Sequence, residues 1–135
     1  GGGADGSIAV FNATEVTFPA NAGIDDALAV AAPFLSKYAS VLSPGDFIQL
    51  AGVLSLTNCA GAPRVKFSLG RPQPTKASPP NLIPEPFQNV DVIPARFKEV
   101  GFPAAEVVAL LASHSVAGAD EVDPAHPGSP FDSTP

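Results

Sequence analysis

Methionine and tryptophan are absent from the 135 residues, and there is a single cysteine. Basic residues are also few, since seven Lys and Arg stand against 13 Asp and Glu, giving a formal net charge of −6. Proteins that bind nucleic-acid phosphates need clustered positive charge, so no nucleic-acid partner is expected. No apolar run approaches the roughly 18–20 residues of a membrane-spanning helix. We therefore expect no membrane partner either.

Proline is abundant, since 16 of the 135 residues are proline. This is more than twice the average usage of about 5%. Seven of them lie within residues 60–89 and leave little room for a helix or a central strand. The sequence predicts a long loop there, with at most short extended pieces such as residues 65–69. Loops of this length inside a compact domain are usually functional or wrapped around something.

Helical patterning precedes this loop. Residues 24–39 carry an apolar stripe at spacings of four, three and four, formed by Ile24, Leu28, Ala31 and Leu35. Pro33 should kink this helix or separate its last turn. A second helix is predicted to begin with Ser43 as N-cap and Pro44 at the first helical position, and to run toward Cys59.

Helical patterning returns at residues 90–100 and again from Pro103. The last helix places four residues on one face, namely Val107, Leu110, Leu111 and His114. Length and pattern together indicate one mostly α domain. Residues 1–22 are Gly-rich and then alternate apolar and polar residues; because no strand precedes Gly6 and no helix clearly follows it, a dinucleotide site is poorly supported.

His114 is the most informative single residue. Its place on the apolar face predicts a ring that points inward with Val107 and Leu111. A lone inward histidine is more often a satisfied core residue than a ligand, but a neutral imidazole in an apolar pocket is also how proteins hold haem iron. The residues alone leave both interpretations open. No pair of His or Cys stands at metal-ligand spacing, so a zinc site is not expected.

Oxygen-bearing residues cluster near both ends of the chain. One cluster contains Gly3, Asp5 and Ser7, and the other contains Asp132 and Thr134, to which Ser115 beside the histidine can be added. Calcium takes six to eight oxygen ligands of such kinds, so each cluster is a plausible partial site. An ordinary turn is the alternative, and for either cluster taken alone it is the favoured one.

Two further residues bear on the cellular compartment. Cys59 is most simply a buried, reduced thiol of an intracellular protein. Asn12-Ala13-Thr14, however, is a glycosylation sequon, which is used only in a secreted protein. A secreted chain with one cysteine implies a disulfide partner elsewhere.

Several motifs together resemble the secreted fungal (class II) haem peroxidases, the family of lignin, manganese and versatile peroxidases. They are residues 2–7, Glu15 with Asn21, residues 84–87, 110–115 and 131–135. They occur in the family's order and spacing over all 135 residues. The resemblance implies an all-helical haem peroxidase fold, of which residues 1–135 form the middle of the catalytic domain. The distal Arg and His would lie upstream, and the C-terminal part downstream.

The resemblance also implies roles for individual residues. His114 matches the axial ligand of the iron of haem b, while Asn21 and Glu15 match residues that support the distal histidine. Two calcium sites are implied, a distal one with Gly3, Asp5 and Ser7 and a proximal one with Ser115, Asp132 and Thr134. Cys59 matches a half-cystine whose partner lies outside this chain, and Asn12 becomes a usable glycosylation site. The protein is expected to be a secreted, extracellular monomer.

Two positions favour one activity within the family. Lignin and versatile peroxidases carry an electron-transferring Trp five residues before the axial histidine, where this chain has Ala109. Asp120, six residues after it, matches the Asp that binds Mn(II) in the manganese-oxidising members. The resemblance therefore implies a peroxidase that uses hydrogen peroxide to oxidise Mn(II) to Mn(III), as in lignin degradation. The alternatives are a low-potential peroxidase acting on small phenols at the haem edge, or an inert fragment.

Overall fold

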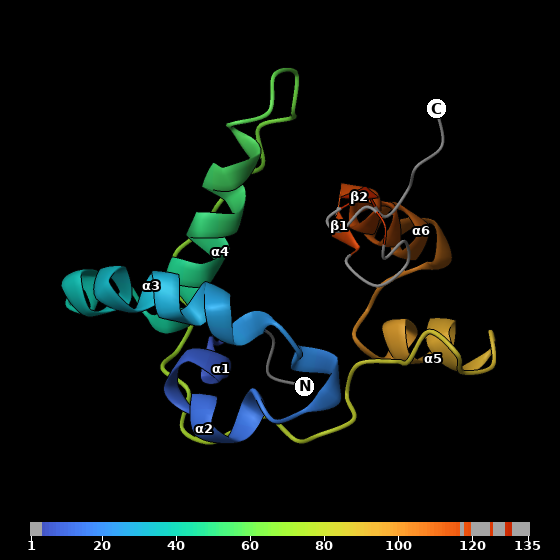
Figure 1. The fold of residues 1–135 in the computed structure, drawn as a ribbon, viewed down its shortest axis with the longest axis horizontal. Coiled ribbons are helices and arrows are strands. Elements are labelled where there is room, and N and C mark those ends of the chain that lie inside the picture. The colour runs from blue at the N-terminus through green and yellow to red at the C-terminus, as the bar shows by residue number, and fades with distance from the viewer. Residues whose placement is uncertain (1–3, 117, 120–124, 126–128, 131–135) are drawn as a thin grey trace. The chain divides into compact units, whose positions relative to one another are not determined.

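The computed structural model describes residues 4–116, 118–119, 125 and 129–130, and it is mostly helical (Figure 1). The helices are α1 (Ser7–Val10), α2 (Asn12–Glu15), the 3-10 helix η1 (Pro19–Asn21), α3 (Ile24–Tyr38), α4 (Pro44–Leu56), α5 (Val92–Glu99), α6 (Ala104–Ala112) and the 3-10 helix η2 (Ser113–Val116). Two strands of two residues each, β1 (Gly118–Ala119) and β2 (Ser129–Pro130), pair antiparallel. The predicted fold class is confirmed. No helix in the described ranges is both long and apolar enough to cross a membrane.

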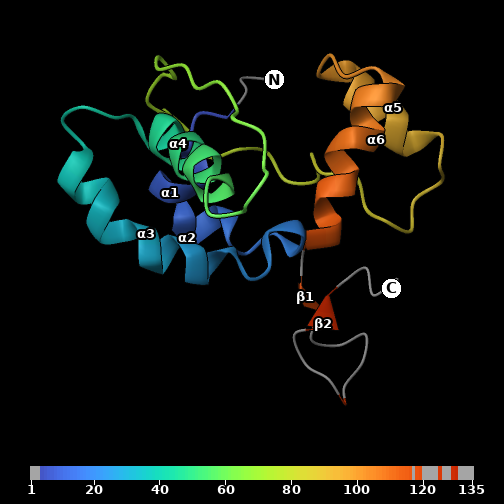
Figure 2. The same cartoon turned by 90° about the horizontal axis from the view of Figure 1, so that it is seen from above.

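The chain forms two compact units, Gly1–Ile83 and Pro84–Pro135. In the first unit, α1 lies beside α4, as both views show (Figures 1 and 2). In the second, α5 contacts α6, and the rings of Phe97 and Phe102 meet edge to face with centroids 6.4 Å apart. The assignment of residues 1–135 to one partial peroxidase domain stays a prediction.

The amphipathic pattern of α3 is confirmed. The four residues of its apolar stripe are half-buried, and all its other residues are exposed. Asp25 and Asp26 occupy the first turn, where the helix dipole favours negative charge. The helix continues through Pro33 to Tyr38, so its last turn is not separated. Proline removes only one N–H donor, and the bonds on either side carry the helix past it.

The predicted start of α4 is also confirmed. Ser43 is the N-cap, and its Oγ accepts a hydrogen bond from the Asp46 N–H at 3.1 Å. Gly45 and Asp46 in the first turn are buried, whereas Leu54 near the other end is 54% exposed. The first turn of α4 is therefore the part that packs against the rest of its unit.

The N-terminal segment is more helical than its sequence indicated. The expectation that no helix follows Gly6 was wrong, because α1 begins at Ser7. Gly6 has φ 78°, a left-handed conformation that glycine adopts readily, and it redirects the chain into the helix. Pro19 begins η1, where its fixed φ suits the first helical position.

The proline-rich segment behaves as predicted. Residues 57–91 contain neither helix nor strand, and the piece 65–69 is unpaired. The predicted burial along α6 holds only in part, since Val107 is 6% exposed while Leu110, Leu111 and His114 are exposed. The prediction of an inward-pointing histidine was thus wrong for the described structure, because Val107 is the only one of these four residues that is buried.

Candidate functional site

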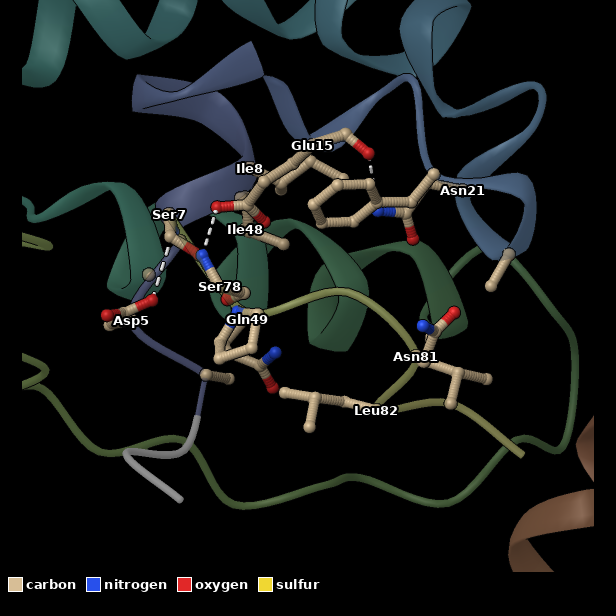
Figure 3. A pocket seen from close by; sticks show the side chains of 17 residues that line it. Asp5, Ser7, Ile8, Glu15, Asn21, Ile48, Gln49, Ser78, Asn81 and Leu82 are labelled. Atoms are coloured by element: carbon tan, nitrogen blue, oxygen red, sulfur yellow. Dashed lines mark hydrogen bonds between the residues drawn. The ribbon is translucent and has the colours of Figure 1, made fainter. Parts of the chain in front are cut away.

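The first unit contains a pocket of about 310 Å³ between α1, α4 and the proline-rich segment (Figure 3). Its walls combine apolar side chains such as Ile8, Phe18 and Leu82 with a small set of polar ones. The polar lining includes Asp5, Ser7, Glu15, Asn21 and Ser78. Four of these five are residues that the sequence singled out, so the fold gathers the N-terminal candidates into one place.

Glu15 lies at the centre of this polar group and is only 3% exposed. One carboxylate oxygen, Oε1, accepts a hydrogen bond from the Ser78 N–H at 2.9 Å. Its main-chain carbonyl accepts a hydrogen bond from Asn21 Nδ2 at 2.8 Å. Burial of a carboxylate is costly unless its oxygens are paired, and the backbone donor from Ser78 supplies such a partner. Glu15 and Asn21 are therefore held together as a unit.

The loop before α1 presents oxygen atoms. The Ser7 N–H donates to Asp5 Oδ1 at 3.0 Å, and the Ser7 and Ser78 hydroxyl oxygens lie 2.9 Å apart. Within the described residues no three His, Cys, Asp or Glu side chains gather around one point. A cation here would accordingly need hydroxyl and carbonyl oxygens beside the Asp5 carboxylate, and that donor set fits Ca²⁺ in kind.

A close backbone contact fixes this loop against α4. A Cβ on Gly6 would lie 2.4 Å from Gly45 N, and a Cβ on Gly45 would lie 2.6 Å from the Ala4 carbonyl oxygen. Real Cβ atoms do not approach backbone atoms so closely, so both positions require glycine. No pattern in the sequence indicated that these two glycines meet.

Asp46 joins α4 to the proline-rich segment. Its Oδ2 accepts the Gly70 N–H at 2.9 Å, and its Oδ1 accepts from the Arg71 guanidinium at 2.9 Å. The Gly70 N–H, followed by the contacts of Arg71 and Ser43, lowers the pKa of Asp46 although desolvation opposes them. The Ser-x-x-Asp spacing of 43–46 is that of a helix-capping motif. It could have drawn attention to Asp46, but not to its partners.

His114 lies in η2, directly after α6, and its side chain is exposed. The adjoining surface of α6 is apolar, because Leu110 is 47% and Leu111 is 50% exposed. An imidazole beside an uncovered apolar face fits the proximal side of a haem, which needs one nitrogen ligand and a dry wall. In the described structure this histidine belongs to the second unit, and the polar group of Glu15 belongs to the first.

Comparison with known proteins identifies the family. Residues 1–127 match the family described as Peroxidase. The chain belongs to the peroxidase family. All of it aligns with versatile peroxidase VPS1 of Pleurotus eryngii at 53% identity, with manganese peroxidase 3 of Phlebia radiata at 52%, and with ligninase H2 of Phanerodontia chrysosporium at 48%. These relatives mark the chain as a class II fungal haem peroxidase sequence.

The peroxidase chain spans about a third of the length of these relatives, since it covers 36%, 37% and 36% of the three. Their names divide among three kinds of peroxidase at nearly equal identity. Overall similarity therefore establishes the class without selecting a reductant.

Some candidate residues of this peroxidase lie outside the described residues, namely Gly3, Asp120, Asp132 and Thr134, and only the backbone of Ser115 is described. Asn12 is exposed at the start of α2, as glycan attachment requires. Cys59 is an exposed thiol, so the interpretation as a buried cysteine was wrong. Exposure leaves its sulfur accessible to a disulfide partner, and the pairing itself stays a prediction.

Proposed function

We propose that the protein containing this chain is a secreted, haem-dependent peroxidase that consumes hydrogen peroxide and oxidises Mn(II) to Mn(III). Membership of the class II haem peroxidases supports the haem and the peroxide. Haem supplies the redox chemistry when bound, and the chain supplies ligation, orientation and a dry environment. Mn(II) is the reducing substrate, and Mn(III) is the product that leaves.

His114 is proposed to ligate the haem iron. An imidazole can offer one nitrogen lone pair to iron, and the exposed position of His114 lets a planar group approach. Leu110 and Leu111, about half exposed, would form part of the wall that excludes water from this face. Burial of these apolar side chains against haem would also add to binding, at roughly 25 cal/mol per Å² removed from water.

Asn21 is proposed to orient the distal histidine. Its Nδ2 is committed to the Glu15 carbonyl at 2.8 Å, and Figure 3 shows its Oδ1 directed away from Glu15. An amide oxygen fixed in this way can accept the N–H of an imidazole, which sets the tautomer and raises the basicity of the other ring nitrogen. The main-chain carbonyl of Glu15 keeps the amide from rotating, and Ser78 holds the Glu15 side chain.

The choice of manganese rests on Asp120, while the residue at position 109 only disfavours oxidation of bulky aromatic substrates. Ala109 is exposed in α6, and the 135 residues include no Trp. Position 109 therefore has no aromatic side chain that could accept electrons from bulky aromatic substrates at the surface. Asp120 supplies a carboxylate, which is the kind of hard ligand that Mn(II) prefers.

Replacement of Asp120 tests the manganese assignment in the full-length enzyme. Asp120→Asn removes one anionic ligand and should raise the KM for Mn(II) by about tenfold or more. The kcat for Mn(II) should fall, and oxidation of small phenols should change little. Asp26→Asn, the same chemical change at an exposed position of α3, serves as the control. Unaltered Mn(II) kinetics in Asp120→Asn would refute manganese oxidation at this residue.

Replacement of His114 tests the haem assignment. His114→Ala should abolish normal haem ligation, seen as loss of the wild-type absorption spectrum, together with peroxide turnover. His126→Ala changes the other histidine of the chain and is the matched control. A wild-type spectrum with full activity in His114→Ala would show that another residue binds the iron.

The second candidate function is a low-potential peroxidase that oxidises small phenols at the haem edge. The Ala at position 109 favours it equally, because such substrates need neither a surface Trp nor a manganese site. The Asp120→Asn kinetics separate the two candidates, since only manganese oxidation depends on that carboxylate.

A further inference from the structure

We propose that Ser78 is a positioning residue for the cation-binding loop Asp5–Ser7, in which its hydroxyl orients the Ser7 hydroxyl so that the Ser7 oxygen faces a bound Ca²⁺. The inference rests on the calcium site that the family resemblance implies at this loop, and on the proposed function as a peroxidase of that family. Ser78 belongs to the proline-rich segment, and neither the sequence patterns nor the resemblance drew attention to it.

Two polar groups of Ser78, its hydroxyl and its N–H, each meet a buried side chain of the N-terminal segment (Figure 3). Its Oγ lies 2.9 Å from the Oγ of Ser7, which is 5% exposed. Its N–H donates at 2.9 Å to the carboxylate of Glu15, which is 3% exposed. Ser78 thus bridges the Asp5–Ser7 loop and Glu15, whose main-chain carbonyl accepts the hydrogen bond from Asn21.

The chemistry of a hydroxyl ligand explains what this contact does. A serine oxygen that coordinates a cation uses a lone pair, so its proton must point away from the metal. An acceptor on that other side stabilises this orientation, and Ser78 Oγ stands at hydrogen-bond distance to take the proton. Groups that orient metal ligands in this way typically contribute 10–100-fold to metal affinity.

Ser78 is itself held in place before any cation arrives. The bond from its N–H to Glu15 fixes its backbone, and Pro79 and Pro80 follow directly and restrict the chain further. Little conformational entropy is therefore lost when the Ser78 hydroxyl accepts a hydrogen bond from the Ser7 hydroxyl. The N–H belongs to the backbone and is still present in Thr and Val at this position, so the hydroxyl can be tested separately.

The test compares Ser78→Thr with Ser78→Val in the full-length, haem-loaded enzyme. The side chains of Thr and Val have nearly the same shape, and only Thr keeps the hydroxyl. Calcium bound per protein is measured after timed exposure to EGTA, and Ser7→Ala identifies the ion that belongs to this loop. Ser40→Ala, at an exposed serine in the turn after α3, is the control. We expect Ser78→Val to lose this ion about tenfold faster than wild type, with Ser78→Thr close to wild type.

Three results would overturn the proposal. If Ser78→Val loses calcium at the wild-type rate and Ser7→Ala loses it faster, Ser78 has no positioning role, although the calcium site itself is supported. Equal acceleration in Ser78→Val and Ser78→Thr would show that side-chain volume, not the hydroxyl, is responsible. Retention of both calcium ions by Ser7→Ala would refute the calcium loop and the role of Ser78 together.

Discussion

Asp46 shows how one residue can connect segments that are far apart in the chain. The sequence predicts that Asp46 lies in the first turn of α4, where the helix dipole favours negative charge. In the structure the side chain instead turns to the Gly70 N–H at 2.9 Å and to Arg71. These contacts hold residues 70 and 71 of the proline-rich segment beside the first turn of α4.

The lowered pKa of Asp46 makes a prediction about acid stability. Because the folded-state pKa lies below the unfolded value of 3.8, the unfolded chain binds more protons at low pH, and the stabilisation is complete above about pH 4. It is lost as the pH falls from there through the folded-state pKa. Asp46→Asn in the full-length enzyme should lower the melting temperature at pH 6 and reduce its dependence on pH below 4.

Melting curves recorded across pH 2.5–7 measure both effects, with Asp26→Asn as the control for a change of charge alone. If wild type and Asp46→Asn show parallel acid profiles, the Asp46 contacts are not what stabilises this part of the fold.

At the scale of elements, the contact between the Gly6 loop and α4 depends on two glycines. Gly45 faces the Ala4 carbonyl oxygen, whereas Gly52, about two turns further along the same helix, has open space around it. The same substitution at these two positions should therefore act in opposite directions.

Gly45→Ala should destabilise the full-length enzyme by about 1–3 kcal/mol, because the new methyl group overlaps backbone atoms that cannot move aside. Gly52→Ala should stabilise it by roughly 0.5–1 kcal/mol, because alanine loses less conformational entropy in a helix. Denaturant unfolding of both variants measures the difference. Equal effects of the two substitutions would contradict the close approach seen at Gly45.

At the scale of the whole molecule, the described residues bury little apolar surface. Val107 is the one hydrophobic side chain among them that is buried, and several large ones are strongly exposed, such as Val30 at 72% and Phe87 at 83%. Hydrophobic burial is the main favourable term in folding and must outweigh the conformational entropy of the chain.

The 135 residues produced by themselves should therefore show no cooperative unfolding transition and no peroxidase turnover, even with haem and Ca²⁺ supplied. Calorimetry of the purified 135-residue chain, beside the full-length enzyme under the same conditions, provides the measurement. A sharp heat-absorption peak from the chain alone would show that the exposed apolar side chains do not limit its stability.

The sequence by itself determined the local features of this protein. The stripe from Ile24 to Leu35, the Ser43 cap and the helix-free proline-rich segment are confirmed, because each depends on residues within a few positions of one another. The motifs also placed the chain in the peroxidase family. The short helices after Gly6 escaped prediction, since runs of four residues carry too little periodicity to be recognised.

Only the tertiary structure decided which residues meet. Glu15 was singled out from sequence, but its partner Ser78 lies 63 positions away, and Gly70 lies 24 positions from Asp46. No local pattern encodes such contacts, because they form when distant segments pack and each buried polar group takes whatever partner the fold brings near. For the same reason the sequence placed His114 on an apolar face, while its exposure depends on what packs over that face of α6.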